Sequence, residues 1–162
     1  MNGLNQVRDA VIAALKDAGT EALPAYEGGA KRWPGAVVAV DAAVNAGRAA
    51  GLGGYLGRRS GGEVYGMQLE AEITLSVRAE RAAACEEAME TAARTMMQGL
   101  PSGLRLEKMS WGGIAWDRAT GMFRREGSAV CRAVFLAERA GDENELLDFI
   151  LKGTVKNEHD EA

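Results

Sequence analysis

The chain of 162 residues has the length of one domain that is large enough to bury a hydrophobic core. Hydrophobic residues make up 47% of it and charged residues 26%, as in an ordinary globular protein. The net charge of -4 argues against a general binder of nucleic acids or anionic membranes, because such a protein needs a basic face. We therefore expect no membrane binding and no specific nucleic-acid binding.

The first predicted element is an amphipathic helix from about Leu4 to Asp17. Asn2 is a suitable N-cap for this helix, and Gly19 is a suitable stop. Its apolar residues recur at steps of three and four and therefore share one face: Leu4, Val7, Val11, Ile12 and Leu15. The prolines and glycines of segment 20–35 exclude a regular element there.

Two strands are predicted next. Ala36 to Val40 is an apolar, largely β-branched run between Pro-Gly and Asp, which is typical of a buried strand. From Met67 to Arg78, apolar and polar residues alternate, which predicts a strand with one buried face and one wet face. Glu70 and Glu72 lie on the wet face, where we interpret them as solvated residues and not as an acid/base pair.

A long glycine-rich loop is predicted between these strands, from about Asp41 to Gly62. Structureless loops longer than about 12 to 15 residues are uncommon in compact domains unless they are functional or disordered. This segment carries Arg48, Tyr55, Arg58 and Arg59, which suggests a flexible arm that becomes ordered on a partner. The alternative is a tolerated surface insertion.

A second amphipathic helix is predicted from about Arg81 to Gln98, with alanines, methionines and Cys85 on its apolar face. A third strand begins at Leu104 and leads to a turn around Asp117 to Gly121. A fourth strand follows, from about Met122 to Ala137. The Gly-terminated turn between the two strands predicts a β-hairpin.

The last predicted element is a helix from about Glu143 to Leu151, with Asp142 as its N-cap. Its apolar residues would dock either on the core of the same domain or on a neighbouring subunit. The predicted fold is therefore α+β in the order α-β-β-α-β-β-α, with one antiparallel sheet of about four strands and the helices packed on one face. Residues 1–153 would form a single domain, and residues 154–162 a polar C-terminal tail.

The sequence contains no recognisable catalytic, cofactor or metal site, so we predict that the protein is not an enzyme. The only histidine, His159, lies in the polar tail, where no triad, general base or metal site is expected. Cys85 and Cys131 do not form a zinc motif; we expect two buried, reduced thiols, and the alternative is a disulfide between them. The N-terminus lacks signal-peptide architecture, which favours the cytoplasm.

Other residues suit contacts with a protein partner. Lys31 and Arg32 form a basic pair that matches an acidic partner, as do Arg58 and Arg59. The tryptophans are either interface anchors or residues of the core and hairpin, since tryptophan is enriched in binding hot spots: Trp33, Trp111 and Trp116.

Several segments resemble small proteins of prophage tail-gene clusters: YEGGAKRWPG at 26–35, GGYLG at 53–57, GLPSGL at 99–104 and WDRATGMFR at 116–124. The predicted order of elements is also similar to that of the tail terminator, or tail completion, proteins of long-tailed phages. These are small α+β subunits that form a ring, usually hexameric, on the end of the tail tube and join it to the head.

The resemblance implies a structural virion protein that stops growth of the tail tube and takes part in head–tail joining. Its implied partners are further copies of itself in a ring, the tail tube protein and the head–tail connector protein. It would be found in the virion tail, and in the host cytoplasm during assembly. The alternatives are another neck, connector or baseplate subunit of the same particle, or a small-ligand-binding domain with a glycine-rich lid.

Overall fold

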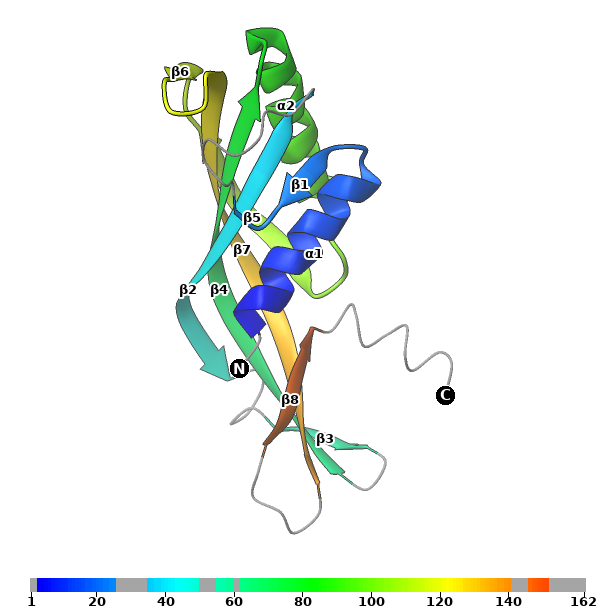
Figure 1. Ribbon diagram of the computed structural model, residues 1–162. Coiled ribbons are helices and arrows are strands. Elements are labelled where there is room, and N and C mark those ends of the chain that lie inside the picture. The colour runs from blue at the N-terminus through cyan, green and yellow to red at the C-terminus, as the bar shows by residue number, and fades with distance from the viewer. Residues whose placement is uncertain (1–2, 26–34, 50–54, 60–61, 141–145, 152–162) are drawn as a thin grey trace.

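The computed structural model describes residues 3–25, 35–49, 55–59, 62–140 and 146–151 (Figure 1). Two helices and eight strands lie in this part of the chain. Their bounds in chain order are α1 Gly3–Asp17, β1 Glu21–Leu23, β2 Val37–Ala49, β3 Tyr55–Arg59, β4 Gly62–Ala79, α2 Ala82–Gln98, β5 Leu104–Trp111, β6 Ala115–Asp117, β7 Met122–Ala140 and β8 Leu146–Leu151.

The eight strands form one mixed sheet, in which the main path runs β1-β2-β4-β7-β5. β1 is parallel to β2, whereas all the other pairings are antiparallel. The prediction of an antiparallel sheet of about four strands is therefore wrong. It missed the short strands, because a strand of three residues such as β1 or β6 is too short to show a period in the sequence.

Two long strands, β4 and β7, form the spine of the sheet and pair along their whole shared length, from Gly62↔Ala140 to Ala79↔Phe123. The other edge of β4 is occupied by β3 at residues 62–65 and by β2 at residues 67–78. The other edge of β7 is occupied by β6, β5 and β8 one after another. The shorter strands thus line both sides of a two-stranded ribbon.

Both helices pack on one face of this sheet, where their apolar stripes share a single core with the strands. On β4 the core residues are the odd-numbered ones from Leu69 to Ala79, which confirms the predicted alternation and its buried face. The largest fully buried side chains include Phe135, Leu15, Ile73, Leu75, Met89 and Met96. The opposite face carries no helix in the described part of the chain, and we call it the open face.

The first two of the three predicted helices are confirmed, and so is the stop of the first. Gly19 adopts a positive φ of 87°, and its N–H donates to the Lys16 carbonyl at 2.9 Å. The N–H of Thr20 donates to the Leu15 carbonyl at 3.0 Å, so that two carbonyls of the last turn are satisfied. Because only glycine adopts this φ without strain, the residue type decides where α1 ends.

The predicted flexible loop at 41–62 is wrong for most of its length. Residues 41–49 continue β2 along β4, with a register shift between Val44 and Ala46, and residues 55–59 form β3. Residues 50–54 and 60–61 lie outside the described part of the chain. The alanines and glycines of this segment have little intrinsic preference for a strand, and the long partner β4 supplies the pairing that the sequence pattern does not reveal.

The predicted C-terminal helix is also wrong, because residues 146–151 form β8 and pair with β7 between Phe135 and Arg139. Five of these six residues are apolar, and such a short run fits a strand and a buried helix equally well. The segment forms a strand because β7 has an edge there with which it can pair, and the local sequence does not show this edge.

Candidate interaction surfaces

The first candidate surface is an arm that extends from the helix-bearing body. β4 has 18 residues and β7 has 19, so that each is roughly 60 Å long at about 3.3 Å per residue. Among the side chains that the structure describes, the first core residue of β4 is Leu69 and the last core residue of β7 is Phe135. Beyond these points the two strands continue with β3 and β8 beside them, in the lower part of Figure 1.

The predicted interface residues of the glycine-rich segment lie on or next to this arm. Arg48 is paired with Gln68 near the end of β2. On β3, Tyr55 is paired with Tyr65, Arg58 with Glu63 and Arg59 with Gly62. The structure thus brings Tyr55, Arg58 and Arg59 together on one strand of the arm. The other predicted interface residues lie outside the described part of the chain: Lys31, Arg32 and Trp33.

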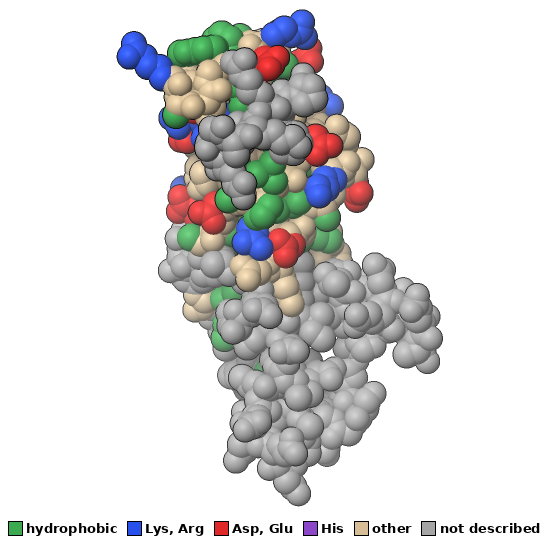
Figure 2. Space-filling model, viewed as in Figure 1, with side chains coloured by type: hydrophobic (Ala, Val, Ile, Leu, Met, Phe, Trp, Pro, Cys, Tyr) green, Lys and Arg blue, Asp and Glu red, His purple; other side chains and the backbone are tan. Residues whose placement is uncertain are grey.

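A second candidate surface lies at the opposite end of the body, on strands β5 and β6. Trp111 is 46% exposed and Trp116 is 54% exposed, so neither is a core residue. Trp116 packs edge-to-face on Phe123, with ring centroids 5.0 Å apart. Hydrophobic side chains reach the surface at the end of the body that carries β6 (Figure 2). Exposure thus excludes a core position for both tryptophans, and Trp116 is a residue of the β6–β7 hairpin; their role as interface anchors stays a prediction.

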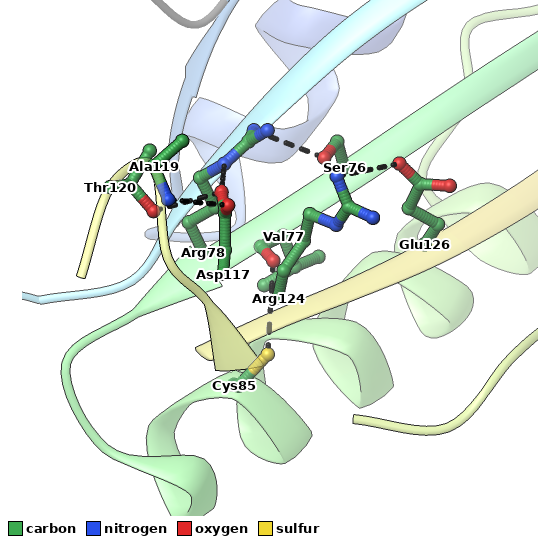
Figure 3. Close-up of polar contacts among 9 residues, drawn as sticks. All are labelled: Ser76, Val77, Arg78, Cys85, Asp117, Ala119, Thr120, Arg124 and Glu126. Atoms are coloured by element: carbon green, nitrogen blue, oxygen red, sulfur yellow. Dashed lines mark hydrogen bonds and ion pairs between the residues drawn. The ribbon is translucent and has the colours of Figure 1, made fainter. Parts of the chain in front are cut away.

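The predicted hairpin around Asp117 to Gly121 is confirmed, since β6 pairs with β7 through Asp117↔Met122. Asp117 holds it in place: one carboxylate oxygen accepts from the Thr120 hydroxyl at 2.9 Å and from the Arg78 guanidinium at 3.5 Å (Figure 3). The other accepts from the Ala119 N–H at 3.1 Å. The hydrogen bond from Thr120, the N–H of Ala119 and the charge of Arg78 hold the pKa of Asp117 below its ordinary value.

These contacts predict a dependence of stability on acidic pH. Because the pKa of Asp117 is lower in the folded state than in the unfolded state, the ionised carboxylate stabilises the fold. This contribution to the free energy of unfolding is present above the ordinary pKa of the group and is lost as the pH falls through the pKa of the folded state. Asp117→Asn keeps the turn acceptor and removes the charge. We expect the variant to melt below the wild type at pH 7, and the difference to shrink on acidification below about pH 4. Thermal melts of both proteins from pH 7 to pH 2.5 would reveal this change. A difference in melting temperature that stays constant over this range would contradict the prediction.

A third candidate surface is a polar trough of about 740 Å³ on the open face. Its floor consists of the small side chains Ser128 and Val130 of β7. Glu70 and Glu72 of β4 form one wall, and Glu107 and Lys108 of β5 are part of the other. Both glutamates lie on the wet face, as predicted, but no local sequence pattern shows that β5 faces them across β7.

The described part of the chain contains two buried cysteines and no cluster of side chains that could bind a metal ion. Cys85 and Cys131 are both buried and neither is in a disulfide, as expected. Burial raises the pKa of the Cys85 thiol, and it raises that of Cys131 to about 11. Among the described residues, no three His, Cys, Asp or Glu side chains are grouped so that they could hold a metal ion. Neither helix in this part of the chain is long and apolar enough to cross a membrane.

Comparisons with known proteins add no assignment. No protein-family model matches the chain, and no curated protein gives a significant match. The resemblance to proteins of prophage tail-gene clusters therefore depends on the sequence segments quoted above, and the likeness to tail terminators on the predicted order of elements, which the structure corrects.

Proposed function

We propose that the protein is a structural assembly subunit of a phage tail, of the tail terminator type, which contacts neighbouring subunits through its arm. The observation that carries this proposal is the extension of β4 and β7 beyond the core, with β3 and β8 paired to them. A projecting sheet of this length offers backbone edges and two faces to other chains, as in other associations through strands.

The paired strands change how the arm works in this proposal. A disordered loop would lose conformational freedom on binding and weaken the contact. Strands that are already paired lose less, so that a preformed arm binds its neighbour with a smaller entropic cost. In a closed ring each subunit uses two different surfaces, and the arm supplies one of them.

In this role the ring, as a hexamer, sits on the end of the tail tube, stops its growth and joins it to the head–tail connector protein. Its place is the virion tail, after assembly in the host cytoplasm. These partners come from the resemblance to tail terminators, and the arm gives them a physical point of contact. The exposed Trp111 and Trp116 provide a second point at the opposite end of the body.

The test shortens the arm without unfolding the body. Replacing residues 56–64 with Asn-Gly retains the Tyr55–Tyr65 pair and closes it with a favoured two-residue hairpin. We expect the full chain to form closed rings, alone or on tail tubes assembled from the tube protein of the same gene cluster. The shortened chain should remain monomeric with an unchanged melting temperature of the body. Native mass spectrometry of both proteins, with and without tubes, measures this.

The matched control is Arg58→Ala/Arg59→Ala, which keeps the length of the arm and removes two charges. A loss of rings only in the shortened chain assigns the contact to arm length, and a loss in both assigns it to these arginines. A shortened chain that still assembles on tubes would contradict the role of the arm. A full chain that ignores the tubes would favour another neck or baseplate subunit.

A further inference from the structure

Two exposed tryptophans lie on the same face of the sheet, at the end of the body that carries β6 (Figure 1). Trp111 is paired with Gly127 of β7, and a Cβ atom at Gly127 would lie 3.3 Å from Met89 of α2, so this row faces the helices. Trp116 is paired with Phe123 of β7. Because alternate residues of a strand share a face, Trp116 also lies on the helix-bearing face. The two rows are about 13 Å apart, at about 3.3 Å per residue along β7.

Both tryptophans are held in place although about half of each side chain is exposed. The ring of Trp116 packs on Phe123. The end of β5 that carries Trp111 is fixed by the next residue, Gly112, whose N–H donates to the Glu126 carbonyl at 3.0 Å. Side chains that are already ordered lose less conformational freedom when a partner binds. The two rings therefore form a pair of preformed apolar anchors.

A positive charge lies between these anchors. Arg125 is paired with the core residue Val77 and occupies the row of β7 between those of Trp111 and Trp116. Its Nε donates to the Gly112 carbonyl at 2.7 Å, which holds the guanidinium against the connection between β5 and β6. Within the described part of the chain, Arg125 has no ion-pair partner. The guanidinium can therefore accept a carboxylate from another molecule.

The other charges at this end of the body are balanced or lie elsewhere. Two ion pairs lie on the open face, Arg78 with Asp117 at 3.5 Å and Arg124 with Glu126 at 3.8 Å. Glu80 and Arg81 are exposed neighbours of opposite sign in the turn before α2. Arg118 is exposed in the turn between β6 and β7 and adds a second positive charge beside Trp116. The charge next to the two rings is thus positive.

We propose that this surface binds an extended acidic segment of a partner protein, in which a carboxylate has a large apolar side chain two residues before it and another two residues after it. Side chains at alternate positions of an extended chain share a face and are about 7 Å apart. Positions i, i+2 and i+4 of the segment therefore match Trp111, Arg125 and Trp116. The apolar side chains pack on the indole rings, and the guanidinium donates charge-assisted hydrogen bonds to the carboxylate.

The connection between the two tryptophans leaves room for such a segment. A Cβ atom at Gly112 or Gly113 would meet no other atom within 4 Å, so the space beside these residues is open. The inference rests on the proposed function only in taking this end of the body as a contact point, and it adds the chemistry of the partner.

A peptide fits this surface better than a nucleic acid. A single strand of nucleic acid needs a track of positive charge along its phosphates in addition to aromatic side chains. Here one guanidinium lies between the rings, and two of the neighbouring arginines, Arg78 and Arg124, are paired with carboxylates. A single carboxylate flanked by apolar side chains is the complementary ligand.

The test uses a synthetic peptide, acetyl-Ser-Phe-Ser-Glu-Ser-Phe-Ser-amide, and the indole N–H signals of the isotope-labelled full chain in nuclear magnetic resonance. Trp111→Phe and Trp116→Phe assign the two signals, and both should shift and saturate with the peptide. Replacing the glutamate of the peptide with glutamine should weaken binding by about fivefold or more. A peptide of the same composition with both phenylalanines next to the glutamate should bind about tenfold more weakly, because its apolar side chains leave the common face.

Variants of the protein assign the contact to individual side chains. Arg125→Gln should bind the glutamate and glutamine peptides equally, and Trp111→Ala or Trp116→Ala should each lower the affinity by about tenfold. The matched controls Arg94→Gln and Met97→Ala change an exposed arginine and an exposed hydrophobic residue of α2, and both should bind like the wild type. Circular dichroism checks the fold of each variant. The comparison of peptides on the wild type tests the proposal even if a variant does not fold.

Equal affinity of the wild type for the glutamate and glutamine peptides would overturn the proposal, as would unshifted signals at millimolar peptide. A single-stranded oligothymidylate that binds more tightly than the peptide would favour a nucleic acid instead. Indole signals that shift with protein concentration alone would favour a second copy of the chain. The arm-shortened chain should bind the peptide as the full chain does. A failure of peptide binding is therefore distinguishable from a failure of ring formation.

Discussion

Replacing Phe135 with alanine is expected to lower the free energy of unfolding by about 3–5 kcal/mol, the usual cost of removing a buried aromatic side chain from a core. Phe135 is 1% exposed and is the largest of the fully buried side chains. It is also the point where the body becomes the arm, since its backbone is paired with Met67 on β4 and with Leu151 on β8. The substitution should therefore loosen β8 as well as the core.

Urea unfolding gives the stability change, and amide hydrogen exchange in residues 146–151 reports on β8. Leu136→Ala is the matched control, because Leu136 is the next residue on β7, points to the open face and is only half-buried. The decrease in the free energy of unfolding should be smaller for Leu136→Ala than for Phe135→Ala by at least about 1 kcal/mol. Equal losses for the two variants, or unchanged exchange in β8, would contradict a junction that depends on Phe135.

The sequence was most informative where an element carries its own period. The alternation from Met67 to Arg78 and the stripe of α1 each reveal a buried face locally, and Gly19 marks a helix end through its own backbone preference. These features depend on residues close together in the chain. The bounds of α1 were accordingly predicted almost correctly, and so was the buried face of β4, although β4 begins at Gly62 and not at Met67.

The arm could not be predicted from local sequence patterns, because it is stabilised by pairing between segments that are distant in the sequence. Gly62 on β4 is paired with Ala140 on β7, at a separation that no local pattern reports. Glycine and alanine in segment 41–62 locally resemble a loop, and the apolar run of β8 locally resembles a helix. In both places the tertiary context overrides local preference.

The candidate sites divide in the same way. Tyr55, Arg58 and Arg59 were singled out by residue type, and the structure places them together on β3. The polar trough was missed, because Glu72 and Lys108 line it together only through β7, which lies between them in space and after both in sequence. The register of a sheet thus determines which charges become neighbours.

The close packing of α2 on the sheet depends on Gly127, and a larger side chain at this position should be strongly destabilising. A Cβ atom at this position would lie 3.3 Å from Cε and 3.4 Å from Sδ of Met89, and 3.5 Å from the Ser110 carbonyl oxygen. Gly127→Val adds two further methyl groups against a methionine that is 1% exposed. We expect a loss of about 1–3 kcal/mol from overpacking.

A double-mutant cycle with Met89→Ala separates this clash from a general intolerance of the strand. Met89→Ala alone leaves a cavity and should cost about 2–5 kcal/mol, whereas in the double variant the valine fills part of that cavity. The coupling between the two changes should therefore be favourable by about 1–3 kcal/mol in urea unfolding. Gly127→Ala should be tolerated within about 1 kcal/mol, because the flexible end of Met89 can shift by a few tenths of an ångström. If the losses in the free energy of unfolding of the two single variants are strictly additive, Met89 is not the reason why glycine is needed at position 127. The contact with the backbone of Ser110 would then be the reason.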